Sequence, residues 1–244
     1  MTENLPTYIP VVFALTTMVT LILFYLAIKF SPEENTARKA NTAAVMMTIW
    51  LSVQAAITWL GIYHADLMAL PPRIMLFGVL PALLVIVAMF ATHSGRQFID
   101  SLSLKHIHWL HIVRIPVEIV LLWLFLHDTI PQLMTFEGRN FDIISGITAP
   151  LIAYFGFTKQ KLSREIILAW NFICLALLFN IVINALLAAP TPLQQFAFDQ
   201  PNVAIFYFPY SWLPTFVVPV VLFCHLVAIR QLWRVKSDEI RVKN

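Results

Sequence analysis

The sequence is poor in charge. Only 12% of its 244 residues are charged, whereas 59% are hydrophobic and the mean hydropathy is +0.78. Soluble globular chains carry about 25% charged residues. A water-soluble domain of this length would therefore lack the polar surface that covers a core. The composition predicts an integral membrane protein surrounded mainly by lipids.

Several familiar chemistries have no residues to support them. The two cysteines, Cys174 and Cys224, both lie in apolar runs, which disfavours a disulfide framework or a structural zinc site. The sequence has no Walker motif, no Gly-x-Ser-x-Gly elbow and no His-Glu-x-x-His zinc helix. The last apolar run has no lysine before Lys236 that could form a retinal Schiff base. We expect no metal site.

Seven apolar runs are candidates for membrane spans, each of which needs about 20 residues. They cover residues 8–30, 42–63, 74–92, 104–127, 143–157, 165–188 and 212–233. The first run is too long for the core of a signal peptide, so we expect it to be retained. The sequence shows no repeat or internal boundary. Residues 1–244 are therefore expected to form a single all-α bundle of seven transmembrane helices.

The basic residues predict the orientation of this bundle. Thirteen of the sixteen lysines and arginines fall on one side of a seven-span arrangement: Lys29, Arg38, Lys39, Arg96, Lys105, Lys159, Lys161, Arg164, Arg230, Arg234, Lys236, Arg241 and Lys243. Because basic residues gather on the cytoplasmic side, we expect an outside N-terminus and a cytoplasmic C-terminus in a plasma or bacterial inner membrane. Their dispersal along membrane edges gives little support to a nucleic-acid partner.

The fourth run carries the most informative chemistry. Its polar residues follow helical spacing along one face: His108, His111, Arg114 and Glu118. Ionisable groups inside a membrane are costly, and they commonly face a cavity and mark a functional path. The structural alternative is an ion pair between Arg114 and Glu118 at positions i and i+4, with both histidines reaching towards the interface. Pro116, between the two charged residues, is expected to disturb the helix.

Polar residues of other runs extend this candidate pathway. His225 of the seventh run has a similar estimated depth to His111, so we expect the fourth and seventh helices to form one pocket. Asn180 and Asn184 share a face of the sixth run. Histidine and asparagine in membrane helices also act as interhelical hydrogen-bonding groups, which is the structural alternative for all three.

The connection between the fourth and fifth runs holds a second polar group. Glu137, Arg139, Asn140 and Asp142 surround Gly138, and they predict either an outer vestibule or a solvated turn that caps the next helix. The connection 189–211 has no lysine or arginine and is rich in Phe and Tyr. It is expected to form an apolar lid or an interfacial aromatic belt.

Three functional classes fit these features. A small transporter or proton-linked permease fits best, because chains of Glu and His relay protons across membranes. A membrane redox subunit is the second class, with His111 and His225 as axial haem ligands, or with Arg114 and a histidine binding a quinone carbonyl. The third is a sensor or assembly subunit without turnover. The expected partners are lipids and a small molecule or proton.

The topology can be tested with reporter fusions. A reporter placed after Asn244 should be active in the cytoplasm, and one inserted near Asp199 should report the outside. The predicted span 212–233 separates these two positions, so they should lie on opposite sides of the membrane. Activity of both reporters on the same side would contradict the seven-span arrangement.

Overall fold

The computed structural model describes residues 5–242, and no strand occurs among them. The longer helices are α1 (Tyr8–Lys29), α3 (Ala40–Trp59), α4 (Leu80–Ala91), α7 (Arg114–Leu126), α8 (Ile143–Leu151), α9 (Arg164–Ala188) and α10 (Val218–Val242). Shorter helices are α2 (Glu34–Arg38), α5 (His93–Asp100) and α6 (Leu104–Leu110). Turns of 3-10 helix are η2 (His111–Val113), η3 (Gln132–Met134) and η5 (Ala204–Phe206), and π-helical turns are η1 (Met75–Val79), η4 (Ile152–Thr158) and η6 (Leu213–Val217).

Five helical stretches are long and apolar enough to cross a membrane: Tyr8–Lys29, Ala40–Trp59, Leu104–Leu126, Arg164–Ala188 and Leu213–Arg234. A sixth arises if Met75–Ala91 is joined to α5, which bends away from it by 90°. The predicted span at 143–157 corresponds to Ile143–Thr158, which is shorter than the roughly 20 residues of a full crossing. The described residues thus form an all-helical protein of membrane type, with five to six helices of spanning length.

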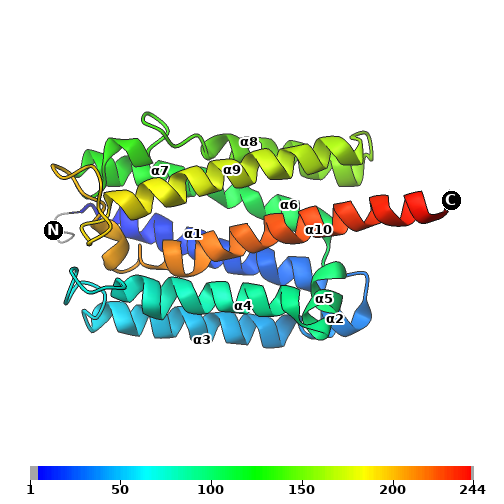
Figure 1. Cartoon of the computed structure of the whole chain (residues 1–244), viewed down its shortest axis with the longest axis horizontal. Helices are drawn as coiled ribbons and strands as arrows, with labels where there is room; N and C mark the ends of the chain where they lie inside the picture. Colours follow the sequence, from blue (N-terminus) through cyan, green and yellow to red (C-terminus); the bar gives the residue numbers. More distant parts are fainter. Residues whose placement is uncertain (1–4, 243–244) are drawn as a thin grey trace.

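The helices run side by side, with α1 and α10 in the middle of the bundle (Figure 1). One flank is formed by α3 and α4, and the other by α7, α8 and α9. The end where α1 begins, with the loops after α3, α7 and α9, is called the N-terminal face below. The opposite end, with α2, α5 and the end of α10, is called the C-terminal face.

Two prolines explain how α3 is fixed to the bundle. The second residue of α4 and the second residue of α10 are prolines, so the carbonyls four residues earlier lack a helical N–H donor. Side chains of α3 replace it: Gln54 Nε2 donates to the carbonyl of Phe77 at 3.2 Å, and Trp50 Nε1 donates to that of Thr215 at 2.9 Å. Lipid offers no such donors, so these bonds hold three helices together.

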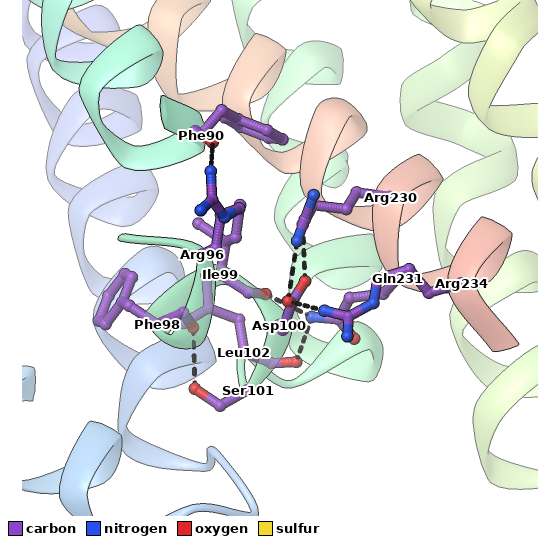
Figure 2. Close-up of polar contacts among 10 residues, drawn as sticks. All are labelled: Phe90, Arg96, Phe98, Ile99, Asp100, Ser101, Leu102, Arg230, Gln231 and Arg234. Carbon is purple, nitrogen blue, oxygen red and sulfur yellow. Dashed lines mark hydrogen bonds and ion pairs between the residues drawn. The ribbon is translucent and has the colours of Figure 1, made fainter. Parts of the chain in front are cut away.

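At the C-terminal face, α5 is fastened to α10 (Figure 2). Arg230 makes a bidentate contact with Asp100, with its Nε at 2.7 Å and its Nη2 at 3.0 Å from the two carboxylate oxygens. Arg234 also contacts this carboxylate. Gln231 Nε2 donates to two backbone carbonyls of the same turn, at 2.7 and 3.1 Å. We call Asp100, Arg230, Gln231 and Arg234 the C-terminal clamp.

We expect Asp100→Asn to lower the free energy of unfolding by about 1 to 2 kcal/mol, because a partly buried carboxylate that binds two arginines is lost. The midpoint of thermal unfolding in detergent would measure this. Asp66→Asn is the matched control: Asp66 is half exposed and lies 3.9 Å from Arg73, so its loss should have little effect. Equal effects of the two substitutions would contradict a structural role of the clamp.

Candidate functional site

The four ionisable residues predicted on one helical face are all buried. His108, His111, Arg114 and Glu118 lie along α6, η2 and α7, and none is more than 3% exposed. The 3-10 turn η2 precedes Pro116, whose missing N–H leaves a carbonyl of this turn without its helical donor. The prediction of a disturbed helix is thereby met. The alternative in which both histidines reach the interface is wrong, because their rings turn into the protein.

Asn171 of α9 joins His108 to His225. Asn171 Nδ2 donates a hydrogen bond to His108 Nε2 at 3.0 Å, and His225 Nδ1 donates to Asn171 Oδ1 at 2.9 Å. His108 Nδ1 donates to the carbonyl of Leu104 at 2.7 Å. These partners assign the Nδ1–H tautomer to both imidazoles. The resulting chain of hydrogen bonds links α6, α9 and α10.

His111 lies against His225 without a hydrogen bond between them. Their ring centroids are 4.0 Å apart and their planes differ by 19°. Trp170 contacts both rings, at 5.6 Å from His111 and 5.7 Å from His225. Both nitrogens of His111 and Nε2 of His225 are buried and make no hydrogen bond in the structure. The fourth and seventh predicted spans are therefore neighbours, but their histidines pack among aromatic rings and line neither cavity described below.

The stacked arrangement does not fit an axial haem pair. Axial imidazoles approach iron edge-on from opposite sides with metal–nitrogen distances of about 2 Å, which sets their ring centroids about 6 Å apart. In this protein the two rings face each other at 4.0 Å, which leaves no space for a porphyrin between them. Within residues 5–242, no group of three or more His, Cys, Asp or Glu residues could hold a metal ion.

Arg114 pairs with Asp142 and not with Glu118. Arg114 Nη1 lies 3.0 Å from Asp142 Oδ1, and both side chains are at least nine-tenths buried. No ion pair joins Arg114 to Glu118 in the described part of the chain, so the structural alternative of an i, i+4 pair is wrong. The geometry of the Arg114–Asp142 contact is not that of a hydrogen bond. All three guanidinium nitrogens and Asp142 Oδ1 consequently lack a hydrogen-bond partner.

Glu118 is bound by a residue of the loop between α7 and α8. Asn140 Nδ2 donates to both carboxylate oxygens of Glu118, at 2.7 and 2.6 Å, and to the carbonyl of Met134 at 3.0 Å. The Oδ1 atom of Asn140 accepts from the backbone N–H of Asp142 at 3.0 Å. The loop and the polar face of α7, which the sequence presents as separate candidates, thus form one buried cluster. We call Arg114, Glu118, Asn140 and Asp142 the central cluster.

A glycine positions Asp142 against Arg114. Gly146 lies in the first turns of α8, and a Cβ atom there would be 2.9 Å from Ile115 Cγ1 and 3.2 Å from Arg114 Cβ. The missing side chain allows α8 to approach η2 and α7 closely. Asp142 immediately precedes α8 but makes no side-chain capping bond to it. The predicted capping role is therefore wrong for Asp142, whose carboxylate faces Arg114 instead.

The remaining predicted site residues lie away from this cluster. Glu137 and Arg139 are exposed on the loop, and the backbone N–H of Arg139 donates to the Leu133 carbonyl at 3.2 Å. Asn180 Nδ2 donates to the Arg139 carbonyl at 2.7 Å, and Asn184 Nδ2 donates to Asn180 Oδ1 at 3.3 Å. Asn180 thus joins α9 to the loop, whereas Asn184 bonds to Asn180 within the same helix, and neither bonds to a histidine among these contacts.

A cavity of about 170 Å³ lies beside the central cluster. It is lined by residues of α7, α9, η1 and the junction of η6 with α10, and Glu118 and Asp142 lie in its wall. Phe206, which is 2% exposed, contributes to the wall from the long connection after α9. Phe198 of the same connection is 69% exposed. The connection thus has one aromatic side chain buried in the cavity wall and another exposed.

Asn171 and the residues of the C-terminal clamp do not figure among the site residues predicted from the sequence. An amide within an apolar run signals that a hydrogen-bond partner exists. It does not say which helix supplies that partner. The spacing of Asp100, Arg230 and Arg234 carries no signal, because about 130 residues separate the partners.

These features define an all-helical bundle of membrane type with a buried polar cluster beside an apolar cavity. Residues 71–233, which are more than half of the chain, match the family described as Domain of unknown function (DUF8737), and the chain belongs to this family. The matched region includes every residue of the central cluster and all three buried histidines. Neither a curated protein nor a solved structure matches the chain.

The pairing within the central cluster can be tested with double variants. Arg114→Met or Asp142→Asn alone should lower the free energy of unfolding by about 3 to 5 kcal/mol, because each leaves a buried charge unpaired. The double variant Arg114→Met/Asp142→Asn should recover most of this loss. Thermal unfolding in detergent measures each effect.

Arg114→Met/Glu118→Gln is the matched control. This pair of substitutions leaves Asp142 unpaired, so it should not recover stability. Recovery in the control, with none in Arg114→Met/Asp142→Asn, would show that Glu118 is the true partner of Arg114.

Proposed function

We propose that this protein is a small proton-linked permease of a plasma or bacterial inner membrane. The observation that carries the proposal is the central cluster: two carboxylates and a guanidinium are buried together, and the guanidinium has no hydrogen-bond partner. Structural ion pairs inside proteins usually satisfy their hydrogen bonds. Unsatisfied guanidinium N–H groups can gain interaction energy from a hydrogen-bond acceptor, and the two carboxylates beside them can gain it from a proton or a donor.

We further propose seven spans, with the N-terminus outside. The helical segments alternate in direction along the bundle, and the loops after α3, α7 and α9 share the N-terminal face (Figure 1). The basic loops before α3, after α4 and before α9 lie at the opposite face. This distribution follows the rule that basic residues stay in the cytoplasm. In this arrangement Ile143–Thr158 is the short fifth span. Gly146 allows this span to approach η2 and α7 closely.

The cluster offers a simple coupling between a proton and a substrate. When Glu118 is ionised, two carboxylates face the cavity and one guanidinium lies behind them. Protonation of Glu118 removes one negative charge, so it changes the attraction of the cavity for any charged solute. His111 and His225 lie towards the C-terminal face and have buried, unpartnered nitrogens that can accept and pass on a proton.

Access from the C-terminal face would require the clamp to open. Asp100, Arg230 and Gln231 join α5 to α10 (Figure 2). His225 lies on the same helix, α10. Breaking a few polar contacts at one face while the other stays closed is the usual requirement of alternating access. A sensor or assembly subunit, the alternative function, would need neither proton movement nor an opening clamp.

The proposal can be tested with purified protein in liposomes that contain a pH-sensitive dye. An organic amine, a carboxylic acid and a neutral sugar would be added in turn under an imposed pH gradient. At least one of them should move protons faster than in protein-free liposomes. Glu118→Gln should remove this flux, because the carboxylate that exchanges the proton is lost.

Glu34→Gln is the matched control. Glu34 is exposed on α2, with 78% of its side chain accessible, so its substitution should leave the flux unchanged. Proton movement at the protein-free rate with every solute would contradict the permease proposal and favour the sensor or assembly function.

A further inference from the structure

The wall of the cavity beside the central cluster is apolar except for a small acidic part. Nearly all of its lining is aliphatic or aromatic, including Val117 and Leu121 of α7 and Ile181 of α9. Apart from Thr191, the polar lining side chains are two carboxylates, Glu118 and Asp142. No described residue that lines the cavity is basic. A solute inside would therefore meet an apolar surface with one acidic patch.

The acidic patch has free capacity for a hydrogen-bond donor. Asp142 is 5% exposed, and its Oδ1 atom lies 3.0 Å from Arg114 Nη1 without making a hydrogen bond, so the carboxylate keeps lone pairs for another donor. Its neutralising partner, Arg114, is not part of the cavity wall. Glu118 already accepts from Asn140, but a carboxylate has about four lone-pair sites and can accept more. Two carboxylates with one guanidinium leave a net negative charge at this point when both are ionised.

The size of the cavity limits the solute. A dry cavity of about 150 Å³ holds one benzene molecule in a well-characterised engineered protein. The volume here is about 170 Å³. A body the size of one aromatic ring or a short branched chain fits such a space.

We propose that this cavity binds small lipophilic ammonium compounds, with the ring or chain against α7 and α9 and the ammonium group at Glu118 and Asp142. This inference rests on the proposed permease function and names its substrate class. A proton on Glu118 and an ammonium group beside it compete for the same negative charge. Binding of the cation therefore opposes binding of the proton, which is the linkage that an exchange of proton for cation requires.

Benzylammonium is a suitable probe, with benzyl alcohol and benzoate as neutral and anionic analogues of similar shape. Titration calorimetry on the full chain in lipid nanodiscs should show binding of benzylammonium, weaker binding of benzyl alcohol and none of benzoate. Benzylammonium should bind less tightly as the pH falls, because protonated carboxylates attract it less. Glu118→Gln should weaken its binding about tenfold or more.

A second variant fills part of the cavity without removing a charged side chain. Ala185→Phe places a ring in the cavity beside α9 and should abolish binding of benzylammonium. Ala82→Phe is the matched control, because Ala82 lines a separate apolar cavity between α1, α3, α4 and α10. It should leave binding unchanged. These two substitutions keep the test valid even if Glu118→Gln fails to fold.

Equal affinity for the three probes, or equal binding by Ala185→Phe and the wild type, would overturn the inference. The same follows if benzylammonium does not bind. Proton flux with another class of solute would then still support the permease proposal. If benzylammonium binds as described but no solute moves protons in liposomes, the binding site stands and the permease proposal falls.

Discussion

Burial of Arg114 is the constraint on which much of this structure depends. A guanidinium inside an apolar bundle costs about 2.5 to 3.5 kcal/mol even on the mildest scale, so it needs an acidic partner. That partner, Asp142, comes from the loop before α8. The loop must therefore enter the bundle, where Asn140 then reaches Glu118. Gly146 has no side chain because α8 must approach closely enough to bring Asp142 into contact.

The sequence is informative where a property depends on one helix alone. The spacing of His108, His111, Arg114 and Glu118 predicts a shared face, and all four are buried on it. It cannot predict partners, because these depend on how distant segments enter the bundle. The i, i+4 rule favours Glu118 as the partner of Arg114, yet tertiary contact with Asp142 replaces it. In the same way, no spacing indicates that Asn171 joins His108 to His225.

A second constraint is that buried backbone carbonyls need hydrogen-bond donors, and side chains far away in the sequence supply them. Prolines in α4 and α10 free two carbonyls, and Gln54 and Trp50 of α3 donate to them. Prolines are visible in the sequence, but the donors are not. The number of spans is similarly only partly predictable. Helices of spanning length stand out by hydropathy, whereas Ile143–Thr158 is apolar but shorter than a full crossing.

The contrast between satisfied and unsatisfied polar groups separates structural from functional candidates. His108, Asn171 and His225 Nδ1 form a closed set of hydrogen bonds, which suits interhelical attachment. Arg114, His111 and Asp142 Oδ1 retain buried atoms without hydrogen bonds. Such atoms lower the stability of the folded state. A proton or donor that satisfies His111 or Asp142, or an acceptor that satisfies Arg114, binds the folded chain preferentially and stabilises it, so the unsatisfied part of the cluster is where binding should be sought.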